Sequence, residues 1–420
     1  MNPGSLPEHF FRHESGRLVA VLSGRVGVGH LELIEDAVQS ALLTAVETWK
    51  SAPIPENPSA WLYRVAWNRL VGDLRQRTRR LAILEKHSGT AFPLSSVDPE
   101  IASEKEIADD LLHMLFFCCD PTMPVESQLV LSLKTLCGWD VREIGLRLFI
   151  TEENVYKRLS RARSHLKARS RPGASSHPAD PDSVAGVLRV LYLLFSEGYL
   201  SIRLDFAVRN DLCLEALRLT DLLARSSVGA TPETAALMAL MHFHQARSSS
   251  RVDGSGGLVL LEDQDRSLWN RDLIQRGLGW LELSARGETY SRYHAEAAIA
   301  AEHSLAPSFS QTDWGKIVHQ YDLLISVEPS ALHELNRAVA MAEATGSAAA
   351  LARLENALPP SWLVLSYQWF AVLADLHFRN GAQDLGNRYF LKALESAPSP
   401  AIKDLLSRRL ASYAGKTKAE

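Results

Sequence analysis

The chain has 420 residues, 46% of them hydrophobic and 22% charged, which is typical of a globular protein of roughly two to four domains. Its 45 Lys and Arg against 49 Asp and Glu give a net charge of −4, which excludes a protein that binds nucleic acid over its whole surface. Residues 1–171 hold 22 basic against 21 acidic residues and the remainder 23 against 28, so DNA contact is expected only in local basic patches of the first part.

Residues 6–86 are predicted to form a first helical domain. An opening helix is followed by a loop at 24–29, and apolar residues at three-to-four spacing predict a second, amphipathic helix over 33–49. Three prolines exclude a helix between 52 and 58. Ser59 is then expected to cap a third helix over 60–80.

The third helix combines aromatic and basic side chains. Its aromatic residues and arginines are Trp61, Tyr63, Trp67, Arg64, Arg69, Arg75, Arg77, Arg79 and Arg80. Unstacked bases lie on aromatic faces while guanidinium groups hold phosphates, so this pattern favours binding of single-stranded DNA. The alternative is that Trp61, Leu62 and Val65 are core residues, and this is expected for Trp61. The later arginines are too many and too close together for the core, so they face water or phosphate.

A linker is predicted over 87–108, because turn-forming and acidic residues alternate there without periodicity. A second domain follows over 109–171. It begins with a helical segment from Asp109 to Cys119, and after Pro121 and Pro124 a further helix is expected over 125–137.

Residues 139–169 predict two helices joined by a tight turn. Ile144 and Leu148 share a face of the first helix, and Thr151 is expected to cap the second. The second helix is apolar on one side and otherwise cationic, through Lys157, Arg158, Arg161, Arg163, Lys167 and Arg169. A helix-turn-helix inserts such a helix into the major groove of DNA. The alternative is a surface helix whose charges are merely solvated.

No metal, cofactor or membrane site is expected. Cys118, Cys119, Cys137 and Cys213 lack a CxxC spacing, which favours buried thiols in a reducing compartment over a metal site. No signal peptide and no apolar run of membrane-spanning length is found, so a cytoplasmic location is predicted.

Residues 172–183 read as a flexible linker, and 184–420 as an all-helical half interrupted by a loop or short hairpin within 247–269. Asp263 and Asp265 in that stretch are expected to cap turns rather than to act as acid and base. Near the end, seven residues have the spacing of a tetratricopeptide (TPR) helix pair: Phe370, Leu373, Ala374, Gly386, Phe390, Ala393 and Pro398. An irregular helical bundle is the alternative for this half.

The elements of residues 1–171 resemble the extracytoplasmic-function (ECF) sigma factors of the sigma-70 superfamily. Residues 33–49 resemble region 2.1–2.2, 58–80 region 2.3–2.4, and 126–169 region 4. The matching positions are Asp36 and Gln39, then Trp61, Leu62, Arg64, Ala66, Asn68, Leu74 and Arg75, then Ile144, Val155, Arg158, Leu159, Arg161, Ala162 and Arg163. Stretches at 198–200, 211–224 and 251–269 resemble the long TPR-like (DUF6596-like) extension of one ECF subgroup.

The resemblance implies an all-α fold: a sigma region 2 domain, a region 4 helix-turn-helix domain and a helical TPR-like regulatory extension over 184–420. It implies that Asp36 and Gln39 bind the β′ clamp helices of core RNA polymerase, that region 4 meets the β flap, and that promoter DNA is bound at the −10 and −35 elements. The DNA-binding residues expected on this basis are Trp61, Arg64, Asn68, Arg75, Arg77, Arg79, Arg80, Glu153, Tyr156, Lys157, Arg158, Arg161 and Arg163. The extension is expected to regulate the sigma unit, by contact within the chain or through a partner.

The sequence therefore predicts a transcription initiation factor that is not an enzyme. One alternative is a helix-turn-helix regulator that binds duplex DNA and carries a TPR-like sensor, which would not need the aromatic and basic helix. A second is an enzyme housed in 184–420, although this half supplies no evident nucleophile–base pair or metal set.

Overall fold

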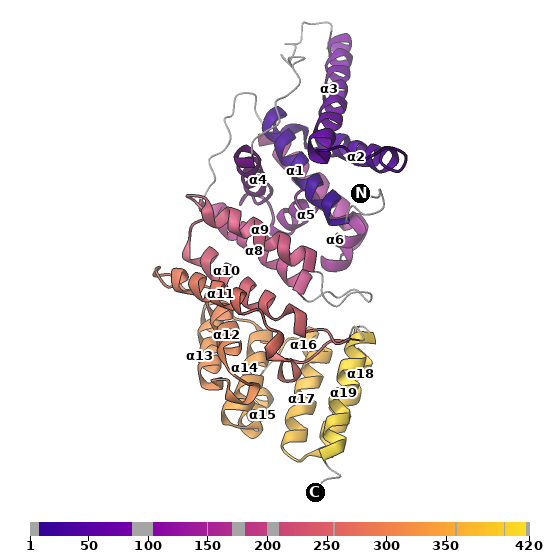
Figure 1. Cartoon of the computed structure of the whole chain (residues 1–420). Helices are drawn as coiled ribbons and strands as arrows, with labels where there is room; N and C mark the ends of the chain where they lie inside the picture. The colour runs from indigo at the N-terminus through magenta and orange to yellow at the C-terminus, as the bar shows by residue number, and fades with distance from the viewer. Residues whose placement is uncertain are drawn as a thin grey trace. The chain divides into compact units, whose positions relative to one another are not determined.

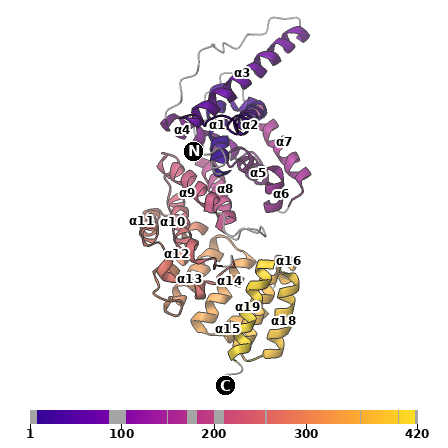
Figure 2. The ribbon, with the colours of Figure 1, turned by 45° about the vertical axis from the view of Figure 1, so that its right-hand side comes forward.

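The structure is a computed structural model that describes residues 8–85, 104–148, 150–169, 181–199, 210–254, 257–357, 359–398 and 400–416. Most described residues are helical, which confirms the all-α class, and their β structure is limited to an isolated antiparallel bridge between Val252 and Leu258. The chain divides into two compact units, residues 1–191 and 192–420 (Figures 1 and 2). The boundary lies inside one helix, α8.

The first unit contains α1 (Glu8–Val26), η1 (Val28–His30), α2 (Leu31–Thr48), α3 (Pro58–Glu85), α4 (Glu104–Cys118), α5 (Val125–Thr135), α6 (Val141–Leu148), α7 (Glu152–Arg169) and the first part of α8 (Pro181–Tyr199). The second contains the rest of α8, then α9 (Asn210–Arg225), α10 (Pro232–Ala246), α11 (Arg271–Ser284), α12 (Arg292–Leu305), α13 (Trp314–Val327), α14 (Ala331–Thr345), α15 (Ser347–Glu355), α16 (Ser361–Val364), α17 (Tyr367–Arg379), α18 (Gln383–Ser396) and α19 (Pro400–Lys416).

Helix α2 forms where its apolar periodicity predicts it. Ile34, Val38 and Ala45 are fully buried against the neighbouring helices, and its other face is exposed. The loop before α2 was predicted to begin at residue 24, which is too early, because α1 continues to Val26. Gly27 follows the last residue of α1 and ends the helix. Its φ of 88° favours glycine, and its N–H donates to the Ser23 carbonyl at 2.8 Å.

Helix α3 also begins earlier than predicted. The side chain of Asn57, not Ser59, caps it, since the Ala60 N–H donates to Asn57 Oδ1 at 3.0 Å. The cap at Asn57 leaves Pro58 as the first helical residue, where proline is tolerated because its missing N–H would have no partner in the helix. The helix is 28 residues long and projects beyond the other helices of its unit (Figures 1 and 2).

Helices α4–α7 bury large side chains, among them Trp139, Ile144, Leu159 and Leu166. The predicted linker at 87–108 lies mostly outside the described residues, but its last five residues, 104–108, form the start of α4.

The first half of α8 packs within the first unit. A Cβ on Gly186 would lie 2.8 Å from Gln128 Oε1 and 3.5 Å from Cys119 Cβ, so α8 approaches the start of α5 closely. The predicted linker at 172–183 lies outside the described residues up to 180, and its last three residues begin α8.

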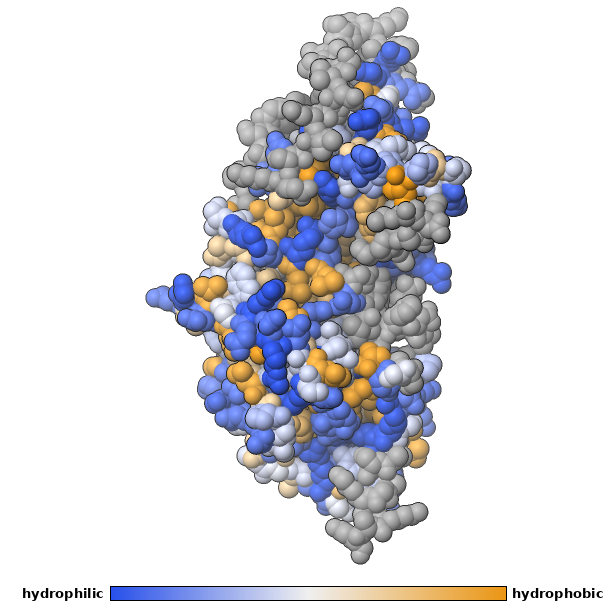
Figure 3. All heavy atoms as spheres, viewed as in Figure 1, coloured by the Kyte–Doolittle hydropathy of each residue, from blue (hydrophilic) through white to orange (hydrophobic). Residues whose placement is uncertain are grey.

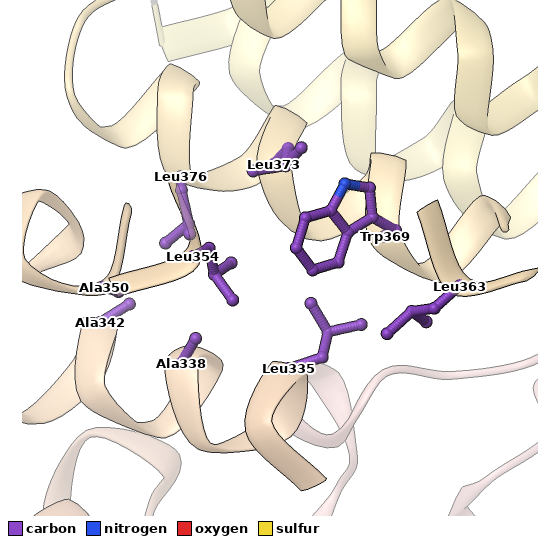
Figure 4. Packing of buried hydrophobic residues seen from close by; sticks show 9 residues of the cluster. All are labelled: Leu335, Ala338, Ala342, Ala350, Leu354, Leu363, Trp369, Leu373 and Leu376. Carbon is purple, nitrogen blue, oxygen red and sulfur yellow. The ribbon is translucent and has the colours of Figure 1, made fainter. Parts of the chain in front are cut away.

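In the second unit, Trp369 of α17 joins a core cluster with α14, α15 and α16. Its indole ring lies among Leu335, Leu363 and Leu373 (Figure 4). The predicted loop or hairpin between α10 and α11 forms around the Val252–Leu258 bridge, and the N–H of Asp253 donates to the Gly257 carbonyl at 2.9 Å. Asp265 caps a turn as predicted, since its carboxylate accepts from the Ser267 N–H at 2.9 Å.

Helices α17 and α18 form the pair that the TPR spacing predicts. Phe390 and Ala393 are buried between them. Gly386 lies against the ring of Phe378, where an added Cβ would come within 2.5 Å of the ring. The small residue therefore allows the two helices to pack closely.

Replacing Gly386 with alanine is expected to destabilise the protein by about 1–3 kcal/mol, because the methyl group displaces a buried aromatic ring. The control is Gly279→Ala in α11, where an added Cβ meets nothing within 4 Å and alanine should gain up to about 1 kcal/mol from helix propensity. Denaturant unfolding of both variants measures the difference. Equal stability of the two would show that α17 and α18 do not pack as described.

Candidate nucleic-acid interface

Helices α6 and α7 form the predicted helix-turn-helix. Asp140 and Glu143 cap α6 reciprocally, with each side chain accepting the other's backbone N–H at 2.6 and 3.1 Å. Thr151 caps α7, since its hydroxyl accepts the Asn154 N–H at 3.3 Å. A Cβ on Gly145 would lie 2.9 Å from the Ile150 carbonyl oxygen, so a glycine here lets the turn close tightly.

Helix α7 presents a cationic face to solvent. Val155, Leu159 and Ala162 anchor it to the core. The predicted residues Glu153, Tyr156, Lys157 and Arg161 are exposed, Arg158 is half-buried, and Glu153 pairs with Lys157 at 2.7 Å. These side chains therefore lie on the solvent-exposed side of the helix.

Arg163 has a different environment from the other predicted cations of α7. It is half-buried and forms an ion pair with Glu35 of α2. The same carboxylate accepts a hydrogen bond from the Thr135 hydroxyl of α5 at 2.9 Å. We name this three-residue arrangement the Glu35 contact. Within it, the charge of Arg163 is neutralised.

Two further features join α1–α3 to α5–α7. Arg12 of α1 donates to Glu143 at 3.1 Å. The pKa of His30 in η1 is lowered by burial and then by the positive charges of Arg77 and Lys167, which come from α3 and α7. The two basic helices therefore bring cations to the same neighbourhood.

The aromatic residues of α3 divide between core and surface. Trp61 is partly buried and lies 5.4 Å from the ring of Trp49. Tyr63 is buried, lies under the guanidinium of Arg25, and stacks on the partly exposed Trp67 at 6.5 Å. Trp67 belongs to the aromatic and basic pattern of the sequence, although it is not in the set of DNA-binding residues that the resemblance implies.

The basic residues of α3 lie on its surface. Arg64, Asn68, Arg75, Arg77 and Arg79 are exposed, and the side chain of Arg80 lies outside the described residues. Figure 3 shows mainly hydrophilic side chains over the described part of α3 that projects from the unit.

Helix α2 presents Asp36 and Gln39 to solvent, as the resemblance requires. Two apolar residues extend the same face at three-to-four spacing, Leu43 with 64% and Val46 with 40% of its surface exposed. Neither was predicted from the sequence as a binding residue. The signal for them was that both are apolar but lie outside the buried stripe of α2. We name Asp36, Gln39, Leu43 and Val46 the α2 face, and its mixed polar and apolar character suits a helical protein partner.

The described residues contain no group of three or more His, Cys, Asp or Glu side chains placed to hold a metal ion. Cys118 and Cys119 are fully buried, and burial raises the pKa of both thiols, that of Cys119 to about 12. None of the described helices is both long enough and apolar enough to cross a bilayer.

Comparison with known proteins identifies three regions. Residues 10–80 match sigma-70 region 2, residues 119–166 match sigma-70 region 4, and residues 183–285 match a family of unknown function, DUF6596. An uncharacterised protein of Rhizobium meliloti (strain 1021) is 35% identical over 330 residues, which cover 78% of this chain and 77% of that protein. No solved structure matches the chain.

Replacing Arg158 and Arg161 together with alanine is expected to weaken binding to duplex DNA. Every phosphate that an arginine no longer neutralises reduces the slope of log affinity against log salt by about 0.9, so the double variant should lower the slope by about 2. A salt titration of binding measures this. Arg218→Ala with Arg225→Ala in α9 removes the same charge elsewhere and should leave the slope unchanged. An unaltered slope in the α7 variant would exclude this helix as the DNA-binding element.

Proposed function

Because the chain belongs to the sigma-70 family, with regions 2 and 4 followed by a DUF6596 domain, we propose that it is an ECF-type factor that directs core RNA polymerase to specific promoters. Sigma-70 regions 2 and 4 support a role as a transcription initiation factor, in which the chemistry of transcription belongs to the polymerase. The domain boundaries that we propose are those of the sequence analysis, except that the second domain begins with α4 at Glu104 and the extension with α8 at Pro181. The proposed location is the cytoplasm, where polymerase and promoter meet.

The combination of three surfaces on the first unit supports this function best. The α2 face has the composition of a protein-binding surface, α3 has exposed arginines and a partly exposed Trp67, and α7 has a cationic face on a helix-turn-helix. A regulator that binds only duplex DNA needs α7 but neither of the other two. A factor that binds polymerase and opens DNA uses all three.

Each surface has a proposed partner. The α2 face docks on the clamp helices of the β′ subunit, with Leu43 and Val46 supplying apolar contact beside Asp36 and Gln39. Residues of α3 bind the opened −10 element, and α7 binds the −35 element, with region 4 held at the β flap. Arg163 joins the DNA-binding set once its pairing with Glu35 is released.

The Glu35 contact has a consequence for promoter binding. Elements at −10 and −35 lie about 25 base pairs apart, or about 85 Å at about 3.4 Å per base pair. Helix α3, at 28 residues, spans only about 42 Å. Since α2 and α7 touch directly through Glu35 and Arg163, binding both elements requires this contact to open. Docking of polymerase on α2 is the step that we propose opens it.

Changing Asp36 and Gln39 to arginine is expected to abolish binding to core polymerase while the fold is kept, because both side chains are exposed. Co-elution of the purified variant with core polymerase in gel filtration measures this. The matched control is Asp272→Arg with Gln275→Arg on α11, which makes the same charge change at the same spacing on another exposed helix face. Co-elution of the α2 variant at the wild-type level would place the docking surface elsewhere.

The extension is proposed to be required for activity, so the fragment 1–171 is expected to direct no promoter-specific transcription. The physical reason lies in α8, whose first half packs on Cys119 and Gln128 of the first unit. Its removal uncovers the buried side chains that it contacts.

In vitro transcription with core polymerase measures this, and fragment 1–199 separates two cases. Activity of 1–199 alone would assign the requirement to α8, whereas inactivity of both fragments would assign it to the helices beyond. Transcription by 1–171 at the full-length level or above would refute the requirement.

A further inference from the structure

Five basic side chains gather in the second unit, between α8, the end of α10, the loop before α11 and the end of α12. We name them the arginine cluster: Arg247, Arg251, Arg266, His244 and His303. Arg247 and Arg251 are each only 7% exposed. All of these residues except His303 fall within the match to DUF6596, whose function is unknown.

Arg247 is the central member, and its side chain has no hydrogen-bonded or ion-pair partner among the described residues. Its Nε is buried and makes no hydrogen bond, and no ion pair or hydrogen bond of its guanidinium to any described residue is found. Its Cζ lies 5.5 Å from the centre of the Trp269 ring, and that ring is fixed by a 2.8 Å hydrogen bond from its Nε1 to the Ser250 hydroxyl. A buried guanidinium with unused donors is costly unless an anion meets it.

The other two arginines are held in place but keep donors to spare. Arg251 donates to the Tyr199 carbonyl at 2.8 Å and lies over the Tyr199 ring at 3.4 Å. Arg266 donates to the carbonyls of His303 and Ala306 at 2.6 and 2.7 Å, yet its Nη2 is buried and makes no hydrogen bond. Rigidly placed arginines with free N–H groups suit carboxylate and phosphate oxygens.

The two histidines add polar atoms without adding charge. The Nδ1 atoms of His244 and His303 are buried and make no hydrogen bond. Burial, and then the positive charge of Arg247 and its neighbours, lowers the pKa of His244 well below its usual value and that of His303 to about 3. Both rings are therefore neutral near pH 7, so the positive charge of the cluster comes from the arginines.

Of the four acidic residues described in the same loop, Asp263 is exposed and the other three are used elsewhere. Asp253 pairs with Arg408, Glu262 pairs with Arg409, and Asp265 caps the turn at Ser267. Among the described residues no carboxylate forms an ion pair with Arg247, Arg251 or Arg266. Burial and mutual repulsion accordingly lower the pKa of Arg251 and of Arg266.

We propose that the arginine cluster is a binding site for a small oxyanion, a compound that carries a phosphate or carboxylate group, with Arg247 as its principal ligand. The low exposure of Arg247 and Arg251 favours a small molecule over a macromolecular surface. Bidentate binding by guanidinium would compensate the buried charge and use the idle donors. This inference stands independently of the proposed function. If both hold, the small anion is a signal to which the extension of the sigma factor responds.

Thermal unfolding of the full-length protein tests the proposal, with inorganic phosphate as one probe and citrate as the other, at constant ionic strength. A ligand that binds only the folded state raises Tm by an amount that grows with its concentration relative to Kd. Phosphate also stabilises proteins without a site, by exclusion from their surface. The comparison among variants therefore decides the result.

Wild type and the control Arg225→Met, an exposed arginine of α9, are expected to respond equally to the anion that fits. Arg247→Met should lose the specific part of that response, with affinity by calorimetry reduced about tenfold or more. Arg247→Lys, which keeps the charge but not the fork of donors, should fall between. A response to phosphate alone assigns a phosphate ligand, and a response to citrate alone assigns a carboxylate.

Stability without added anion provides the second readout. Arg247→Met should then be at least as stable as wild type, because it removes a buried charge that no described carboxylate pairs with. A marked loss of stability in anion-free buffer would make Arg247 a structural cation and overturn the proposal. Identical responses of wild type and Arg247→Met to both probes would overturn it as well.

Discussion

The first unit is organised around one carboxylate. Glu35 of α2 pairs with Arg163 of α7 and accepts a hydrogen bond from Thr135 of α5, so it joins three helices that are far apart in sequence. It lies on the same helix as the proposed polymerase-docking face, and it neutralises one cation of the helix-turn-helix. A change that pulls α2 away therefore also restores positive charge to α7. Under the function that we propose, this ion pair couples polymerase docking to DNA binding.

The two units use arginine in opposite ways. On α3 and α7 the guanidinium groups are mostly exposed, where hydration makes an unpaired charge inexpensive and DNA phosphates can reach it. In the loop after α10 they are buried against Trp269 and Tyr199, where an unpaired charge is expensive. Exposed cations suit an extended polyanion such as DNA, and buried ones suit a small anion. The net charge of the chain, −4, reveals neither arrangement.

Local patterns predicted much of this fold. The apolar stripe of α2, the Thr151 cap of α7 and the Gly386 spacing of α18 each depend on residues within a few turns of one another, and all three appear in the structure. The cap of α3 was misplaced because Asn57 and Ser59 are both good capping residues. Pro58, which is favoured at the first position of a helix, was the local signal for Asn57. The pairing of Glu35 with Arg163 and the burial of Arg247 were not predictable, since each depends on partners brought together by the tertiary fold.

Promoter-specific transcription tests the central claim most directly. Purified full-length protein is mixed with core RNA polymerase and a pool of promoter fragments, and the start sites of the transcripts are mapped. The account predicts transcripts from defined start sites that require both the protein and core polymerase, together with weak, salt-sensitive duplex binding by the protein alone. Tight, sequence-specific duplex binding without core polymerase, and no transcript with it, would contradict the account and identify a helix-turn-helix regulator instead.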